Sequence, residues 1–427
     1  MQNEQTSGIT APDVKKSFAM LFLTIFIPFG MGHFISYLYR TVNAVIYSDL
    51  SSELQLPAQS LGLLTGVYFL TFAAAQLPLG VMLDRYGPRS VQSPMLLIAA
   101  AGSVIFALSH SEIGLLIGRS LIGLGVAGSL MSAIKACSIW LPADRLPLST
   151  ACLLSVGGLG AMASTAPLHA ALNWISWREA FLVLALLTVL VSALIHFSVR
   201  GSFIAKNTRF IEMCREVGNL YRSWTFWRLG LYSVFAHATY MAILALWMAP
   251  WLRDVAGLNP KQMANALMLG TVAMVAGSLS FGWLTDYLRK YAVQPIMICG
   301  CGVIVFVLFQ MLMVSGLAVS PYLVTVGFSF FGTAATMNYA IVAQSVEPTL
   351  AGRVSTSFNL VVFVLAFAVQ WLVGAVISHW DAIAGSYPVV AYQWSLMLLI
   401  GLQLPGLLLW LSFRPWKLTQ GKITSVV

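Results

Sequence analysis

Charged residues are scarce in this sequence of 427 residues, and their scarcity excludes a soluble core. Asp, Glu, Lys and Arg make up 9% of the chain, whereas hydrophobic residues make up 59%. Apolar runs long enough to cross a bilayer recur from one end of the sequence to the other. Because lipid offers no hydrogen-bond partners to backbone groups, runs of this length must be helices, and a barrel would instead show alternating segments of about ten residues.

Cysteines and nucleotide-binding motifs are also scarce. The 5 cysteines lie in predicted spans or on the predicted inner side, so we expect no disulfide. Cys299 and Cys301 would face apart on a helix, which argues against a metal pair. The sequence contains no Gly-x-x-x-x-Gly-Lys loop and does not support ATP hydrolysis. We therefore expect neither a cofactor nor an enzymatic activity.

The apolar runs predict an all-α membrane protein with twelve transmembrane helices. The predicted spans are residues 17–47, 59–83, 92–110, 112–138, 149–172, 179–198, 227–252, 261–284, 292–314, 321–345, 354–378 and 391–413. The first run follows a polar start and has no small-residue cleavage site after it. We therefore expect it to be retained and not removed as a signal peptide.

The basic residues outside the spans predict the orientation. Only Arg178, Arg253 and Lys261 lie on one side of the membrane, and all other Lys and Arg residues of the loops and tails lie on the opposite side. Because basic loops stay in the cytoplasm, we expect both termini to be cytoplasmic and the protein to lie in the cytoplasmic (inner) membrane. Orientation accounts for the net charge of +9, so nucleic-acid binding is not needed to explain it.

The longest polar stretch divides the chain into two halves. Residues 199–226 are rich in basic side chains and predict a cytoplasmic linker lying on the lipid headgroups. The predicted organisation is a cytoplasmic tail at 1–16, a six-helix half at 17–198, this linker, a second six-helix half at 227–413 and a cytoplasmic tail at 414–427.

A short charged motif occurs once in each half and indicates a duplication. In the first half it consists of Gly80, Asp84, Arg85, Gly87 and Arg89. In the second half, Gly282 and Asp286 repeat the Gly-x-x-x-Asp spacing, but Tyr287 stands in place of the arginine. Internal repeats of this kind are typical of secondary transporters.

Four motifs, in this order, resemble the major facilitator superfamily over essentially the whole chain. The first is the charged motif at Gly80–Arg89, and the second consists of Arg119, Gly123 and Gly125 in helix 4. Trp140–Arg145 resembles the loop after helix 4, and Trp177–Phe181 resembles the entry to helix 6. The resemblance implies two pseudo-symmetric six-helix halves, and it does not fix the substrate.

The charged motif suggests a latch between the halves. Asp84 is expected at a cytoplasmic helix end, where a carboxylate can meet the positive N-terminus of a neighbouring helix or a cation such as Arg85 or Arg89. The resemblance implies that such contacts break and re-form as access alternates between the two sides. Alternatively, Arg85 and Arg89 only anchor the topology. Tyr287 predicts a weaker latch in the second half.

Arg40 is the main candidate for substrate binding. A guanidinium inside a span is costly unless it faces water or a partner. His33, Tyr37 and Arg40 recur at i, i+4 and i+7, so they would line one helix face. Together with Gln76–Gly80 and Trp140–Arg145, Arg40 resembles the organic-anion and sugar-phosphate branches, in which a helix 1 arginine binds the anionic group. Alternatively, Arg40 lies close enough to the outer end to snorkel.

Two further cations lie inside predicted spans. Lys135, one turn before the cytoplasmic end of helix 4, could bind a substrate carboxylate or could snorkel to the surface. For Arg119, the resemblance implies a structural or proton-coupling role.

The acidic residue that commonly follows the helix 4 glycines in the organic-anion branch is missing. No Asp or Glu lies near the centre of any predicted helix. If protons drive transport, His33, His169 and His237 are the interior groups that titrate near neutral pH. Such histidines also serve as packing residues, and an exchanger or facilitator needs no proton site. The coupling ion, a proton or another, therefore stays open.

Helix 7 offers a second kind of site. His237 and Met241 share a face at i, i+4, and imidazole with thioether suits Cu(I), although no second pair accompanies them and methionine is a common packing residue. Tyr240 and Trp247 nearby would equally suit an organic solute. The sequence therefore marks His237 and Met241 as weak metal candidates only.

Neutral hydrogen-bonding groups lie at membrane depth in the second half. Asn338, Tyr339, Gln344, Asn359 and Gln370 could bind a polar substrate or could pair between helices. A cationic first half facing a neutral polar second half suits a substrate with one anionic group and other hydrogen-bonding groups.

We therefore predict a secondary active transporter that moves a small, carboxylate-bearing organic solute by rocker-switch alternating access. Its expected partners are this solute, the lipid bilayer and, if transport is coupled, protons or another ion, and we expect it to work as a monomer. The alternatives are a copper importer or a lipophilic-compound exporter of the same superfamily, or a transporter-like ligand sensor, for which the sequence shows no signalling domain.

Overall fold

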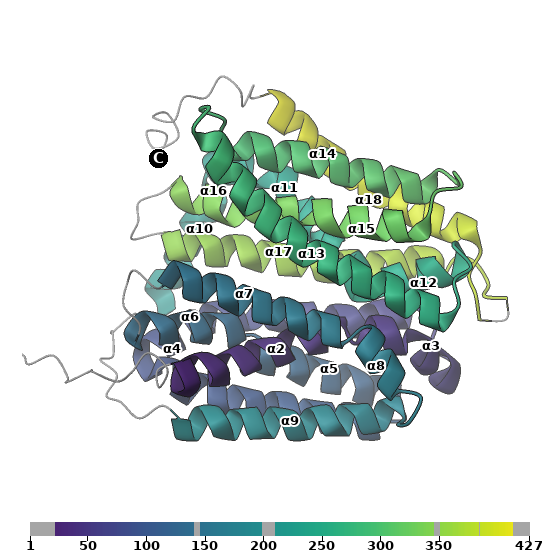
Figure 1. Ribbon diagram of the computed structural model, residues 1–427, viewed down its shortest axis with the longest axis horizontal. Coiled ribbons are helices and arrows are strands. Elements are labelled where there is room, and N and C mark those ends of the chain that lie inside the picture. The colour runs from purple at the N-terminus through teal and green to yellow at the C-terminus, as the bar shows by residue number, and fades with distance from the viewer. Residues whose placement is uncertain (1–21, 141–145, 199–209, 346–350, 384, 413–427) are drawn as a thin grey trace, which may run out of the picture.

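The computed structural model describes residues 22–140, 146–198, 210–345, 351–383 and 385–412 (Figure 1). The predicted tails at 1–16 and 414–427, and the loop that follows Trp140, lie outside these residues. The described chain is almost entirely helical and forms two stacked halves, one coloured purple to teal and the other green to yellow (Figure 1).

The first half contains the elements up to residue 198. They are η1 (Phe22–Phe26), α2 (Ile27–Thr41), α3 (Asn43–Leu54), α4 (Ala58–Leu108), α5 (Glu112–Val126), α6 (Ser129–Trp140), α7 (Leu146–Ala163), α8 (Ala166–Ala171) and α9 (Trp177–Ser198).

The second half follows a linker helix, α10 (Phe210–Arg222), which lies within the predicted linker. Its elements are α11 (Trp224–Ala242), η3 (Ile243–Trp247), α12 (Met248–Asp254), α13 (Pro260–Arg289), α14 (Pro295–Val314), α15 (Pro321–Gly332), η4 (Thr333–Met337), α16 (Asn338–Gln344), α17 (Ala351–Ile377) and α18 (Val389–Ser412).

The helices account for the twelve predicted spans. Of the described residues, 9 helices are long and apolar enough to cross a membrane. One of them, α4, has 51 residues and is interrupted at Gly87, so it makes two passes. Two more passes are divided among shorter elements, one at residues 22–54 and one at residues 146–171. The predicted all-α fold is confirmed.

The structure corrects two predicted boundaries. The charged motif, expected to form a loop, is helical on both sides of Gly87, which alone has non-helical dihedral angles (φ 79°, ψ 163°). Glycine reaches a positive φ without a Cβ penalty, and Pro88 suits the first turn of the helix that follows. The first span continues to Leu54 and not only to residue 47, because hydropathy marks the apolar part of a helix and not its polar extension.

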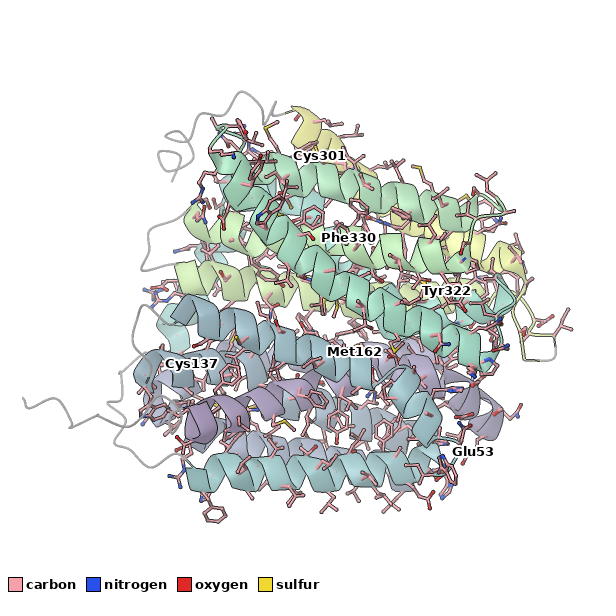
Figure 2. All side chains as sticks on the ribbon, viewed as in Figure 1. Glu53, Cys137, Met162, Cys301, Tyr322 and Phe330 are labelled. Atoms are coloured by element: carbon pink, nitrogen blue, oxygen red, sulfur yellow. The ribbon has the colours of Figure 1, made fainter. Side chains whose placement is uncertain are left out.

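We name the two ends of the bundle by an acidic residue at each. The Glu53 end carries Glu53, α8 and α12, and the opposite Asp84 end carries Asp84 and α6 (Figures 1 and 2). At the Glu53 end, Trp177 donates to Glu53 at 2.6 Å and Arg178 donates to it at 2.8 and 3.0 Å. Arg178 also donates to the carbonyl oxygens of Ala107 and Ser109 at 2.7 Å. These contacts join α3, α4 and α9 within the first half.

The two halves meet most closely along α4 and α17 near the Glu53 end. A Cβ at Gly62 would lie 2.5 Å from the carbonyl oxygen of Gln370, and a Cβ at Gly374 would lie 2.6 Å from that of Ala58. Glycine therefore allows the two backbones to come into contact. The helices α7 and α13 also lie side by side near α8 and diverge toward the Asp84 end (Figure 1). The halves are thus packed together at the Glu53 end.

Candidate substrate-binding site

Arg40 lies in the last turn of α2, at the boundary between the halves. Its guanidinium carbon is 4.5 Å from the centre of the Tyr37 ring, 5.3 Å from that of Phe72 and 5.2 Å from that of Phe363. The Nε atom is buried and has no hydrogen-bond partner among the described residues. Aromatic faces attract a cation but do not neutralise it. Arg40 therefore keeps hydrogen-bonding capacity toward an anion.

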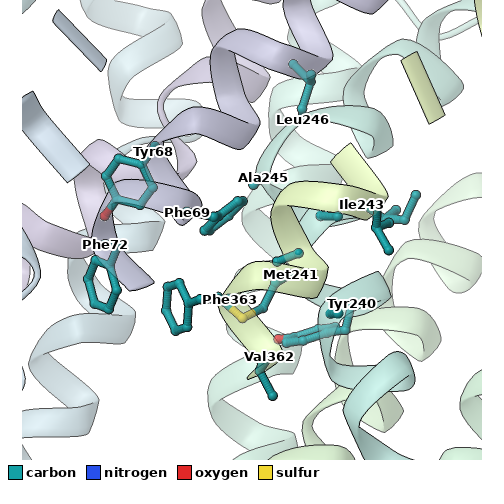
Figure 3. Close-up of a cluster of buried hydrophobic side chains, with 14 of the residues drawn as sticks. Tyr68, Phe69, Phe72, Tyr240, Met241, Ile243, Ala245, Leu246, Val362 and Phe363 are labelled. Atoms are coloured by element: carbon teal, nitrogen blue, oxygen red, sulfur yellow. The ribbon is translucent and has the colours of Figure 1, made fainter. Parts of the chain in front are cut away.

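The aromatic floor under Arg40 comes from both halves. Phe72 of α4 and Phe363 of α17 stack with their ring centres 4.3 Å apart and nearly parallel, at 6°. Figure 3 shows these two rings face to face, with Tyr68 beside them on α4. The guanidinium thus lies over the point where α4 and α17 meet, so a relative movement of the halves changes its surroundings.

The predicted face of α2 contains three neighbouring side chains. The His33 and Tyr37 rings are 5.0 Å apart in a T-shaped arrangement, and Tyr37 in turn contacts Arg40. His33 is buried, and neither ring nitrogen has a hydrogen-bond partner among the described residues. Gly157 of α7 makes room for this face, since a Cβ there would lie 2.7 Å from His33 Nε2 and 3.0 Å from Tyr37 Cδ2.

The second half contributes a wall of neutral polar groups. His237 lies 5.6 Å from the Tyr339 ring and 6.3 Å from the Tyr240 ring. Tyr339 donates to Asn359 Oδ1 at 2.7 Å, and Tyr232 donates to Asn338 Oδ1 at 3.1 Å. Each of these asparagines thus uses its side-chain oxygen to bond with a tyrosine of another helix, which is the alternative to substrate binding that the sequence left open.

Several buried polar atoms of this wall have no partner among the described residues. They are His237 Nδ1, Tyr240 Oη and Asn338 Nδ2, in addition to both His33 nitrogens and Arg40 Nε. Buried polar groups are normally paired, so a cluster of unpaired ones marks a place where a ligand or water completes the bonding. His33 and His237 are both close enough to Arg40 to interact with its charge. The two unpaired imidazoles thus lie near one cation, one from each half.

Within the described residues, no carboxylate forms an ion pair with Arg40. Their acidic side chains lie in loops, near helix ends, beside the break of α4 or in the linker helix α10, at positions 49, 53, 84, 112, 179, 216, 254, 286 and 381. A buried cation without a counter-ion favours an anionic ligand. The chemistry of the site is therefore one positive charge, an aromatic floor and neutral hydrogen-bonding groups.

Lys135 lies at the Asp84 end, apart from this cluster. Its Nζ atom is 2.8 Å from Asp84 Oδ1, and each side chain is about one-third exposed, at 30% and 31%. Sequence reasoning grouped Lys135 with the substrate-binding residues, whereas the structure pairs it with the acidic residue of the charged motif.

Other charged residues of the motif and its second copy lie at the surface or beside an aromatic ring. Arg85 lies over the ring of Tyr86 at 5.4 Å, and Asp286, in the second copy of the motif, is exposed. A Cβ at Gly282 would meet nothing within 4 Å.

The weak metal candidates do not gain a third ligand. Among the residues that the structure describes, no group of three or more His, Cys, Asp or Glu side chains could hold a metal ion. His169 lies on α8 at the Glu53 end and is partly exposed.

Comparisons with known proteins fit this geometry. A model of the Major Facilitator Superfamily matches residues 29–370. The chain belongs to this superfamily. It is 24% identical over 272 residues to a probable sulfoacetate transporter of Cupriavidus necator, which covers 60% of this chain and 63% of that one. It is also 24% identical over 278 residues to a probable L-galactonate transporter of Escherichia coli, covering 61% of each chain. The chain thus spans less than two thirds of the length of these two relatives.

A longer match and the solved structures extend the comparison. The hexuronate transporter of Escherichia coli is 22% identical over 374 residues, which cover 79% of this chain and 85% of that one. A bacterial homolog of the human lysosomal transporter Spinster superposes with a TM-score of 0.73 at 17% identity, covering 93% of this chain and 98% of that one. The nucleoside transporter NupG gives a TM-score of 0.72 at 10% identity, covering 92% and 99%. These likenesses show the superfamily fold.

The helix 4 motif of this superfamily member packs α5 against its neighbours. Arg119 is buried and donates to the carbonyl oxygen of Tyr39 at 3.1 Å. A Cβ at Gly123 would lie 2.4 Å from the Tyr68 carbonyl oxygen, and one at Gly125 would lie 2.4 Å from the Ala99 nitrogen. Both glycines therefore allow the helices to approach closely, which is a packing role.

Sequence reasoning missed Tyr68, Phe72 and Phe363. Aromatic and aliphatic residues fill every span of a membrane protein, so nothing in their spacing distinguishes these three from those that face lipid. The pairing of α4 with α17, which brings Phe72 to Phe363, is a property of the folded chain only.

Proposed function

We propose that this protein is a secondary active transporter of a small organic acid and that Arg40 binds the anionic group. The observation that carries the proposal is the Arg40 guanidinium itself, which lies between the halves over three aromatic rings without a carboxylate partner among the described residues. A cation retained at such a position is costly unless a ligand compensates for it. An anion at Arg40 would also touch both halves, as alternating access requires.

The names of the relatives support an anionic substrate. Sulfoacetate, galactonate and hexuronate are each acids, and the proteins named for them share 22% to 24% identity with this chain. The neutral wall formed by His237, Tyr240 and Asn338 would bind the remaining polar groups of the solute, because each carries an unpaired buried atom. The substrate class that fits best has one carboxylate and further hydrogen-bonding groups.

The charge distribution supports a defined orientation. Basic residues concentrate on one side of the predicted spans. This would place both termini in the cytoplasm and the Glu53 end on the outer face of the inner membrane. The halves are packed together at the Glu53 end, so this conformation would offer access from the cytoplasm. The charged motif, including Asp84 and its partner Lys135, would then act as a latch at the inner end. Each half supplies one wall of the site, and a monomer would suffice.

Uptake into proteoliposomes tests the proposal. Purified protein is reconstituted and offered radiolabelled sugar acids, sulfoacetate, a lipophilic cation and Cu(I), with and without an imposed pH gradient. We expect uptake of one or more acids, and Arg40→Ala should lower kcat/KM by about thirtyfold or more because a charged partner is lost. Arg40→Lys should recover only part of it, since an ammonium lacks the planar fork of a guanidinium.

The control is Arg289→Ala, which removes an exposed cation in the last turn of α13. If Arg40→Ala takes up organic acids as fast as the wild type at an equal protein level, Arg40 does not bind the substrate. Uptake of Cu(I) or of the lipophilic cation in place of acids would favour the alternative transport classes, and binding without uptake would favour a sensor.

A further inference from the structure

Asp254, the last residue of α12, is buried in a network that sequence reasoning did not foresee. Its side chain has 0% exposure and forms an ion pair with Arg253, whose Nε lies at 2.6 Å and whose terminal nitrogen lies at 3.2 Å. The same carboxylate accepts a hydrogen bond from Tyr392 Oη at 2.5 Å and one from the Tyr387 backbone amide at 3.2 Å. All of these partners belong to the second half.

Two of these partners reach across to the first half. The Arg253 guanidinium donates to the Gly385 carbonyl oxygen at 2.9 Å and lies 5.0 Å from the centre of the Tyr47 ring of α3. Tyr387, held by Asp254 through its backbone, accepts a hydrogen bond on its side-chain hydroxyl from the Ala58 amide at 3.0 Å. One buried carboxylate therefore positions both contacts.

The contact to Ala58 caps a helix from the opposite half. The first amides of a helix have no partner within the helix and are usually bound by the side chain of the N-cap residue. The N-cap of α4 is Pro57, which forms no side-chain cap. The second half fills this role, because Ser378 Oγ accepts from the Gln59 amide at 2.9 Å beside the bond from Ala58 to Tyr387.

We propose that Asp254 is a positioning residue for the transport cycle, holding Tyr387 and Arg253 so that the second half caps α4 and covers Tyr47 at the Glu53 end. Separation of the halves at this end breaks the bonds of Tyr387 and Ser378 to α4 and exposes two amides to water. The network thus favours the conformation that is closed at the Glu53 end. The bonds of Glu53 with Trp177 and Arg178 at the same end differ from this network, because both partners lie within the first half. Separation of the halves would therefore leave them intact.

Distance measurements between spin labels test this proposal without knowledge of the substrate. Labels are attached at Ser52→Cys and Asp381→Cys, which are exposed on opposite halves at this end, in a chain whose 5 native cysteines are replaced by serine. The full-length protein in lipid nanodiscs should show one dominant short distance. Tyr387→Phe and Ser378→Ala each remove one cap, and loss of a cap should raise the population at longer distances about threefold to thirtyfold.

Asp254→Asn should produce a larger opening than either hydroxyl variant, because both cross-half contacts lose their support. Should that variant not fold, Tyr392→Phe loosens the carboxylate without removing it and should also open this end. Tyr322→Phe is the matched control, since Tyr322 donates only to Gln262 within the second half. Distances that stay unchanged in the Tyr387, Ser378 and Tyr392 variants, or that shift equally in the control, would overturn the proposal. Because no transport is measured, this result is independent of whether organic acids are the substrate.

Discussion

Lys135 Nζ lies 2.8 Å from Asp84 Oδ1, so a cation from α6 neutralises the acidic residue of the charged motif within its own half. This ion pair joins α6 to α4 just before the break of α4 at Gly87. Lys135 therefore competes with any positive group of the second half for the Asp84 carboxylate. This contact is the basis for testing Lys135 as part of the latch and not as a substrate ligand.

Lys135→Met should alter turnover and leave substrate affinity unchanged. The pair is about one-third exposed, so it contributes only about 0–1 kcal/mol, and we expect a change in kcat of no more than about fivefold. Asp84→Asn should slow turnover in the same way. Uptake kinetics with a parallel binding measurement check this, and Lys290→Met serves as the control because Lys290 stacks on Tyr287 at 3.7 Å outside the pair. A large loss of affinity in Lys135→Met would return Lys135 to the binding site.

Gly157→Ala should weaken substrate binding without unfolding the protein. The added Cβ would lie 2.7 Å from His33 Nε2, so the imidazole and the adjoining Tyr37 must shift. Overpacking of this kind costs about 1–3 kcal/mol, and we expect KM to rise about tenfold. Gly401→Ala in α18 is the control, because a Cβ there meets nothing within 4 Å. Equal KM values for the two variants would mean that His33 and Tyr37 do not contact the substrate.

The sequence predicted the parts of the fold and site that depend on residue type and spacing. Twelve apolar runs gave the helices, and a cation inside an apolar run marked Arg40. Positions that depend on contacts between distant segments escaped prediction. The ion pair of Asp84 with Lys135 joins residues 51 positions apart, and nothing in the sequence indicated it. Asp254 looked like a residue at a helix end, because its partners Tyr387 and Tyr392 lie more than a hundred residues away.

The Glu53 cluster predicts how stability depends on pH. Partial burial opposes ionisation of Glu53, but hydrogen bonds from Trp177 and Arg178 outweigh it and lower the pKa of this carboxyl. A pKa that is lower in the folded state contributes stability above the pKa of the unfolded state, and the contribution is lost as pH falls through the folded value. The melting temperature should therefore fall on acidification from about pH 5 to pH 3, and Glu53→Gln should flatten this part of the profile. If the melting temperature of Glu53→Gln falls by the same amount on acidification, other carboxyl groups cause the loss of stability.

His33 and His237 should carry any dependence of transport on protons. No described carboxylate pairs with Arg40, whereas these two imidazoles are buried in the first helix of each half. Their ring neighbours are Tyr37, Tyr240 and Tyr339. Histidine is the side chain that ordinarily titrates near neutral pH. The double variant His33→Gln/His237→Gln should therefore lose any variation of uptake with pH.

The control for the double variant is His379→Gln, which alters an exposed imidazole bonded to the Ala375 carbonyl oxygen at the Glu53 end. Adding His169→Gln should change nothing further, because His169 is partly exposed on α8 at the Glu53 end, unlike the two buried imidazoles. Uptake that still varies with pH in the triple variant would require a different proton carrier. Wild-type uptake that does not vary with pH would instead favour an exchanger or a facilitator, for which the buried imidazoles serve only as hydrogen-bonding groups for the solute.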